Sequence, residues 1–363
     1  MNSSNKISVL QLCIILTMTV GLANHVTVIP LLLQTAKRDA WISVIAAFLF
    51  FIAWIWIPFA IASKTGQANL IDWLKSHVGV WFARLIQGAA AAYLLSIAFI
   101  AMKETANWTK VTYLPQTPLI VIVISLVILC CYTASKGIQA IAITAGVLLP
   151  FVVILGYFVM GANFQYKRYN LLFPMITNEL SSIAQCAIYI GGGFIELIVI
   201  LFMQHFLSRP IKWVHLFALL SVMCGLTIGP LIGSIAAFGP EEAAMLRYPA
   251  YEQWRLVTIG DYVAHVDFFS IYQWLSGSFI RISLSIFLIV DLFQVRQPRK
   301  RQLFINLISL CLFILCLLPI SDMTYIAYIH NYYAITFCTA FVFSLVLITL
   351  VVVKSKQKGR SSL

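Results

Sequence analysis

Charged residues are scarce in this sequence. Asp, Glu, Lys and Arg make up 10% of the 363 residues, whereas hydrophobic residues make up 61%, and the mean hydropathy is +0.95. A soluble domain ordinarily carries about a quarter charged residues. The shortage of charge excludes a soluble globular protein, and the composition predicts an all-α polytopic membrane protein embedded in a lipid bilayer.

The sequence also lacks the patterns that carry catalysis or bind metals. It contains no Ser–His–Asp spacing, no cluster of metal-ligating residues and no phosphate-binding loop. We therefore expect no enzyme activity, no cofactor and no metal site. The eight cysteines lie in or beside apolar segments. We interpret them as small packing side chains rather than as a disulfide framework.

What the sequence has in place of charge is a series of apolar runs near the ~20 residues that cross a hydrocarbon core. They predict ten membrane-spanning helices in one transmembrane domain, residues 1–363. The longest stretches outside the spans are 161–180 and the outer loop 239–265, and neither could fold as a separate soluble domain. The predicted spans are Ile7–Leu33, Trp41–Ala62, Val80–Met102, Leu119–Tyr132, Ile138–Met160, Ser181–Phe206, Trp213–Phe238, Val266–Phe293, Leu303–Leu318 and Tyr325–Val353.

The net charge of +12 does not indicate a nucleic-acid partner, because the basic residues fall in short loops between spans. Of the 24 basic residues, 15 lie on the side of both termini, eight on the other side, and Arg281 within a span. An excess of Lys and Arg marks the cytoplasmic side. Both termini are therefore predicted to be cytoplasmic, and residues 354–363 form a basic cytoplasmic tail.

The sixth predicted span contains three consecutive glycines in the stretch YIGGGFIELIVI, residues 189–200. Glycine lowers helix propensity. We predict that the helix is broken and unwound at Gly191, Gly192 and Gly193, and that the freed N–H and C=O groups bind a polar ligand. The alternative is that small residues here let neighbouring helices approach closely.

The first predicted span carries a second interruption in the stretch TVGLANHVTVIP, residues 19–30. If the chain consists of two five-helix halves, 7–160 and 181–353, spans one and six occupy equivalent positions. Matching interruptions in two halves indicate the binding site of an inverted-repeat transporter. This hypothesis assigns ligand-binding roles in the first span to Gly21, Leu22, Ala23 and Asn24.

Two opposite charges lie inside predicted spans. Glu196 is 15 residues past Ser181, and Arg281 is 14 past Asp267. Because both spans run in the same direction, each charge descends roughly 20–23 Å and the two reach similar depth. A carboxylate there must be protonated, paired or hydrated. We predict a buried Glu196–Arg281 pair at the ligand site, the alternative being a neutral acid in a structural hydrogen bond.

Four serines surround Arg281 in the eighth predicted span. Their hydroxyls either line the ligand site or bond back to the backbone of their own helix. A guanidinium nearby disfavours a sodium ion, because it already supplies a positive charge. We include Ser276 among the candidate ligand-binding residues; the others are Ser278, Ser283 and Ser285.

These segments together resemble the spore germination protein family, the permease-like B subunits of nutrient germinant receptors. The resemblance runs from Ile7 to about Val353. It is carried by GLANHVTVIPLLLQTAKRDAWISVI (21–45), by GGGFIELIVIL (191–201) and above all by RYPAYEQWRLVTIGDYVAHVDFFSIYQWLSGSFIRISL (247–284). In the last segment the matching positions are Tyr248, Pro249, Arg255, Gly260, Asp267, Trp274 and Arg281.

The resemblance implies the LeuT-like inverted-repeat fold of the amino acid–polyamine–organocation superfamily, with helices 1 and 6 broken. It further implies a small nutrient ligand, often an amino acid. The family's B subunits act in the spore inner membrane with an A-type subunit and a lipoprotein C-type subunit. The residues alone leave two functions open: a germinant-sensing receptor subunit, or a proton- or sodium-coupled amino-acid transporter with Glu196 as proton carrier.

Overall fold

The computed structural model describes residues 6–258 and 265–360, so Gly260 and the last three residues of the tail lie outside the described chain. The first half contains α1 (Val9–Leu22), the π-helix η2 (Ala23–Val28), α2 (Ile29–Ala36), η3 (Lys37–Asp39), α3 (Ala40–Trp54), α4 (Trp56–Lys64), α5 (Leu70–His77), α6 (Val80–Thr112), α7 (Leu119–Lys136), α8 (Ile138–Ala162), η4 (Phe164–Tyr166) and η5 (Tyr169–Leu172).

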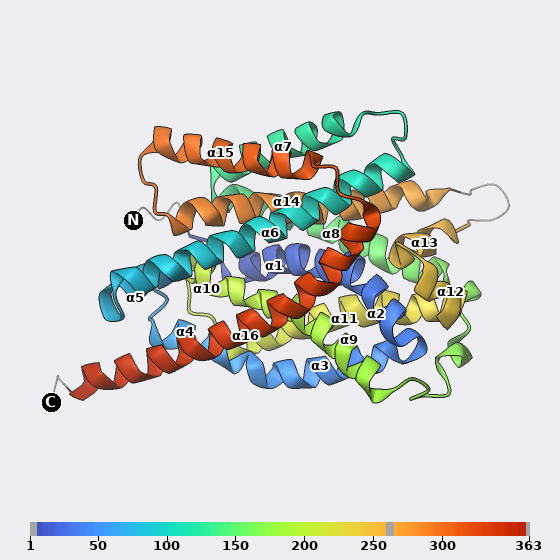
Figure 1. The fold of residues 1–363 in the computed structure, drawn as a ribbon, viewed down its shortest axis with the longest axis horizontal. Coiled ribbons are helices and arrows are strands. Elements are labelled where there is room, and N and C mark those ends of the chain that lie inside the picture. Colours follow the sequence, from blue (N-terminus) through green and yellow to red (C-terminus); the bar gives the residue numbers. More distant parts are fainter. Residues whose placement is uncertain (1–5, 259–264, 361–363) are drawn as a thin grey trace.

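The second half contains α9 (Leu180–Phe194), the 3-10 helix η6 (Ile195–Val199), α10 (Ile200–Met203), η7 (Gln204–Phe206), α11 (Trp213–Phe238), α12 (Pro240–Met245), α13 (Pro249–Arg255), η8 (Val266–Phe268), α14 (Phe269–Leu292), α15 (Pro298–Leu317) and α16 (Asp322–Arg360). The helices lie roughly side by side (Figure 1). We call the end with α12 and α13 the loop end, and the opposite end the terminal end.

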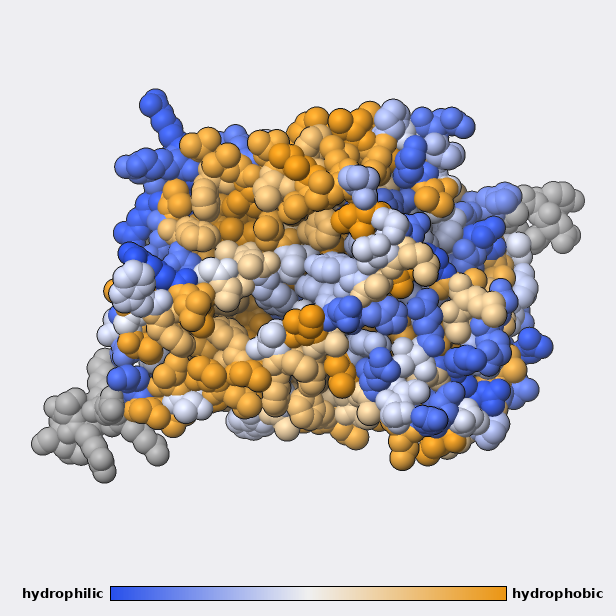
Figure 2. All heavy atoms as spheres, viewed as in Figure 1, coloured by the Kyte–Doolittle hydropathy of each residue, from blue (hydrophilic) through white to orange (hydrophobic). Residues whose placement is uncertain are grey.

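The described helices have the length and composition of membrane spans. Nine stretches qualify, and the first, Val9–Lys64, doubles back at η3. A hydrophobic band separates hydrophilic side chains at the two ends (Figure 2). The chain is thus an all-helical, polytopic membrane protein. The ten-span count, the LeuT-like arrangement and the division into repeats stay predictions.

The helices differ sharply in how deeply they lie inside the bundle. In the most apolar windows of 180–206 and 266–292, 89% and 83% of residues are buried within the protein, against 22% for 138–166. The segments α9–η7 and α14 therefore form the centre, where polar side chains are shielded from lipid. The two predicted charges, Glu196 and Arg281, lie on these central segments.

The predicted unwinding at the glycines is wrong. Gly191, Gly192 and Gly193 belong to α9, which continues through Phe194 and then tightens into the 3-10 helix η6. The first span changes register too, from α1 to the π-helix η2 and back to α2. An altered helix keeps its backbone groups bonded to each other, whereas an unwound one at membrane depth would need other partners.

The helix of the third predicted span, α6, is longer than predicted. The sequence places the span end at Met102, but α6 continues to Thr112 and buries Lys103 and Glu104. The Lys103 ammonium donates to the carbonyl oxygens of Cys316 and Leu318, at 2.8 and 3.1 Å. A lysine at the carbonyl end of α15 satisfies groups that the helix leaves unpaired. These two carbonyl partners make the burial of the Lys103 ammonium tolerable.

The span that contains η2 is fastened to the α9–η7 segment at both ends. At the terminal end the Ile7 N–H donates to the Phe206 carbonyl (2.8 Å) and the Ser208 N–H to the Ile7 carbonyl (2.9 Å). At the loop end the buried Asp39 carboxylate accepts three backbone N–H groups at 2.8 Å each. Those donors are the N–H groups of Ile176, Thr177 and Asn178.

The three glycines permit close packing between these fastened segments. A methyl group on Gly191 would lie 2.6 Å from the Phe337 ring, and one on Gly192 would collide with the Tyr333 carbonyl, both on α16. A methyl group on Gly193 would collide with the Asn24 side chain of η2. The alternative interpretation of the glycines, that small residues let neighbouring helices approach closely, therefore fits the structure, because each glycine leaves room for a neighbouring helix.

We predict that Gly192→Ala destabilises the protein by about 1–3 kcal/mol, because the backbone it would meet cannot move aside as a side chain can. The matched control is Gly88→Ala. Gly88 also lies within a helix, but a methyl group there meets nothing within 4 Å. Thermal unfolding of both variants in one detergent tests this. Equal melting temperatures for the two would contradict the packing role.

Candidate functional site

A buried ion pair joins the two central segments. Both terminal guanidinium nitrogens of Arg281 donate to Glu196, with Nη1 at 2.7 Å from Oε2 and Nη2 at 2.5 Å from Oε1. Glu196 is 1% exposed and Arg281 is 3% exposed. The predicted Glu196–Arg281 pair is confirmed. Two parallel hydrogen bonds between opposite charges fix the relative position of η6 and α14.

The first span contributes a further hydrogen-bond partner to this pair. Arg281 Nη1 also donates to the carbonyl oxygen of Thr19 on α1, at 2.8 Å. Thr19 lies four residues before η2, so the guanidinium holds α1 just below the change of register. The pair is therefore electrically neutral and bonded to three segments, which is how a low-dielectric interior accommodates two charges.

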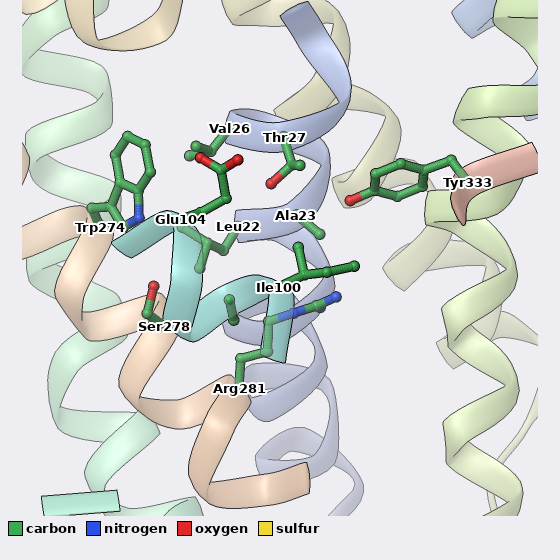
Figure 3. A pocket seen from close by; sticks show the side chains of 11 residues that line it. Leu22, Ala23, Val26, Thr27, Ile100, Glu104, Trp274, Ser278, Arg281 and Tyr333 are labelled. Atoms are coloured by element: carbon green, nitrogen blue, oxygen red, sulfur yellow. The ribbon is translucent and has the colours of Figure 1, made fainter. Parts of the chain in front are cut away.

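A small, partly enclosed space lies on the loop-end side of Arg281, and we call it the inner cavity. Its volume for a water-sized sphere is about 10 Å³, about the room that one water molecule needs. In Figure 3, Glu104 lies on one side of it and Arg281 on the other, with Trp274 and Tyr333 flanking. The wall is formed by Leu22, Ala23, Val26, Thr27, Ile100, Ala101, Glu104, Trp274, Ser278, Arg281 and Tyr333.

A second space, the outer cavity, lies nearer the loop end and has a volume of about 20 Å³. Val26, Thr27 and Glu104 belong to the walls of both cavities. The two spaces are therefore neighbours, separated by these three side chains. The other residues of the outer wall are Pro30, Leu31, Gln34, Arg247, Tyr248, Ile326 and Ile329.

Glu104 stands between the two cavities and is bonded to the linker that joins α12 and α13. Arg247 Nη2 donates to Glu104 Oε1 at 2.8 Å, and the Tyr248 hydroxyl donates to Oε2 at 3.3 Å. Burial, and next the Glu104 charge, raise the pKa of the Tyr248 hydroxyl above its ordinary value. Tyr248 therefore keeps its proton near neutral pH and remains a donor.

Aromatic rings flank one side of the inner cavity. Trp274 stacks on Trp108 with ring centroids 4.1 Å apart. Its Nε1 donates to the Thr105 hydroxyl at 3.1 Å, which in turn lies 2.5 Å from the Ser278 hydroxyl. Ser278 itself lines the inner cavity. The site therefore combines two carboxylates, a guanidinium, hydroxyls and aromatic faces.

The structure places the predicted ligand-binding residues unequally. Leu22, Ala23 and Arg281 line the inner cavity, and Glu196 is bonded to Arg281. Ser276 is buried but is absent from both cavity walls, where Ser278 contributes instead. The remaining predicted residues pack between helices: Gly21 against Leu226, the glycines 191–193 as described above, and Asn24 against Gly193.

Asn24 has one further property. Its side chain is 0% exposed, and neither its Oδ1 nor its Nδ2 has a hydrogen-bond partner among the residues that the structure describes. An unpaired buried amide is costly, at about 1–3 kcal/mol. Asn24 packs against Gly193 and is absent from both cavity walls, so its ligand-binding role stays a prediction.

Several residues of the site were not predicted from the sequence. Glu104 was missed because hydropathy ended the third span at Met102. The available signal was the sequence AMKETANW itself, since an aromatic residue and further helix-forming residues follow the charges. Tyr333 and Trp274 were missed as wall residues because a single sequence does not show which helices are neighbours.

We predict that Arg281→Gln destabilises the protein strongly, by about 3–5 kcal/mol, because it leaves a carboxylate buried without a cation. The double variant Glu196→Gln/Arg281→Gln should be destabilised less than the sum of the two single variants. Thermal unfolding of the four proteins measures the coupling. The matched cycle is Glu252→Gln/Arg255→Gln, a pair on α13 that is 2.9 Å apart and partly exposed, where we expect little coupling. Additive losses at 196 and 281 would refute the pair's role.

Comparison with known proteins gives a consistent result. The family model described as "Spore germination protein" matches residues 6–324. The chain is 41% identical over 352 residues to Spore germination protein XB of Bacillus anthracis, covering 97% of this chain and 99% of that protein. It is 25% identical over 173 residues to Spore germination protein A2 of Bacillus subtilis (strain 168), 47% of each chain. This chain belongs to the spore germination protein family.

Proposed function

We propose that this chain is the nutrient-sensing subunit of a spore germination receptor and that it binds a small polar nutrient, such as an amino acid, beside η2. The observation that carries the proposal is the inner cavity. It brings a π-helical turn, a buried guanidinium and a buried carboxylate to one partly enclosed space within a family member. Buried charges that converge on a cavity are typical of a ligand site.

Binding requires the site to open. The two cavities have volumes of about 10 and 20 Å³, which is room for water but not for an amino acid. A ligand therefore binds a second conformation in which the walls have moved apart, and it shifts the protein toward that conformation. A membrane protein with two conformations of unequal ligand affinity is suited to signalling.

The rest of the proposal follows the family resemblance. Partner subunits of the A and C types receive the signal, and the assembly lies in the spore inner membrane. The loop end faces outward and both termini are cytoplasmic. The candidate contacts are Gly21, Leu22, Ala23, Asn24, Gly191, Gly192, Gly193, Glu196, Ser276 and Arg281, to which the cavity walls add Glu104 and Ser278.

The alternative function, an ion-coupled transporter with Glu196 as proton carrier, is less well supported. Both carboxylate oxygens of Glu196 are already bonded to the Arg281 guanidinium, whereas a proton carrier needs a carboxylate oxygen that can meet a proton donor. The same guanidinium repels a sodium ion from this depth. Gradient-driven accumulation of an amino acid by proteoliposomes that contain the chain would instead support transport.

We predict that spores without this chain lose their germination response to at least one nutrient from a panel of amino acids and sugars. The fall in optical density after nutrient addition measures the response. Reintroducing the wild-type chain or Gly88→Ala should restore it, whereas Arg281→Gln should not. Unchanged germination of the deletion strain with every nutrient, at parental rates, would rule out the sensing function.

A further inference from the structure

We infer that Glu104 receives a primary ammonium group of the ligand, and that Arg247 occupies this place in the ligand-free protein as a displaceable internal cation. The inference rests on the proposed function, because it names the chemistry of one end of that ligand. It assigns the Glu104–Arg247 pair to recognition of the ligand, and it assigns the movement that follows binding to the linker between α12 and α13.

Glu104 has the position that such a role requires. Its side chain is 7% exposed, and it belongs to the walls of both cavities. Glu104 therefore lies beside both the space nearer the loop end and the space beside Arg281. A buried carboxylate holds a cation far more strongly than an exposed one, because no water competes with the interaction.

The cations around Glu104 differ in how firmly they are held. Lys103, its neighbour in the chain, is turned away and bonded to the carbonyls that end α15. Arg281 is bonded to Glu196 and to the Thr19 carbonyl. Among the described residues, the cation that reaches Glu104 is Arg247, through a single nitrogen at 2.8 Å.

Arg247 is the partner that can leave. Its side chain is 38% exposed, whereas both members of the Glu196–Arg281 pair are at most 4% exposed. It also lies on the short linker between α12 and α13 and not on a long central helix. An arginine that withdraws from Glu104 is hydrated at once, so the exchange costs little for Arg247. Glu104, however, needs another cation, and an incoming ammonium supplies it.

The walls restrict the body that carries this ammonium. Beside Glu104 the outer cavity is lined by Ile326 and Ile329, and the inner cavity by Val26 and Trp274. These surfaces favour a compact apolar body over a long polar chain. The expected class is a small primary amine or amino acid with a short apolar side chain.

Displacement of Arg247 gives binding a mechanical consequence. Arg247 lies over the Tyr248 ring, 5.4 Å from its centroid, and the Tyr248 ring packs edge-on against Trp274 at 5.3 Å. Tyr248 also donates to Glu104 and is followed directly by α13. A cation exchange at Glu104 therefore moves the loop end and the aromatic wall together.

Chemical rescue tests the inference without a germinant. Arg247→Ala should lower the melting temperature, because it leaves Glu104 buried without a cation. Ethylammonium should then raise it in a concentration-dependent way, by about 2–4 °C near saturation. Ethanol at equal concentration should not. The double variant Glu104→Gln/Arg247→Ala should not respond to ethylammonium, because the carboxylate is gone.

The matched control is Arg255→Ala, which removes an arginine from a carboxylate pair in the same loop but away from both cavities; no rescue is expected. If Arg247→Ala does not fold, Arg247→Gln serves in the same assay. Absence of rescue in these variants, equal rescue in the double variant, or rescue by methylguanidinium alone would overturn the assignment. None of these results bears on whether deletion abolishes germination, so the two proposals fail separately.

Discussion

A backbone surrounded by hydrocarbon must find its hydrogen-bond partners within the protein, and this constraint shapes the whole site. It explains why the first and sixth spans change register instead of unwinding: α1 widens into η2 and α9 tightens into η6. Each change redirects side chains while the helix continues. The glycines contribute by letting η2 and α16 approach α9 closely, which places Asn24 and Tyr333 at the centre of the bundle.

In the low-dielectric interior of the bundle, the carboxylates of Glu196 and Glu104 are paired with cations in two different ways. Glu196 is matched by a cation that is equally buried and that also bonds to α1, so removing either partner is far more costly than keeping both. Glu104 is matched by a cation from a partly exposed linker. The first arrangement fixes the architecture of three helices, whereas the second ties a buried charge to a part of the protein that can be hydrated when it moves.

The sequence predicted what depends on distance along one helix and missed what depends on which helices are neighbours. The depth of Glu196 and Arg281 follows from the rise per residue, and their pair is confirmed. The predicted unwinding at the three glycines was wrong. Low helix propensity favours unwinding, but the facing Phe337 and Tyr333 favour a close-packed helix. Glu104 was missed because hydropathy treats a charge as the end of a span, although a loop arginine makes its burial possible.

Under the proposed sensing function, the small size of the cavities determines how ligand binding would produce a signal. If a large open pocket existed in the ligand-free protein, a ligand could fill it without changing the relative stability of two conformations, and no signal would follow. Here the space beside Arg281 has room for about one water, so under the proposed function a nutrient would bind a conformation other than this one. The affinity that is lost in opening the site appears as the free energy that shifts the equilibrium. In the proposed mechanism, a site too small for its ligand therefore couples binding to a change of shape.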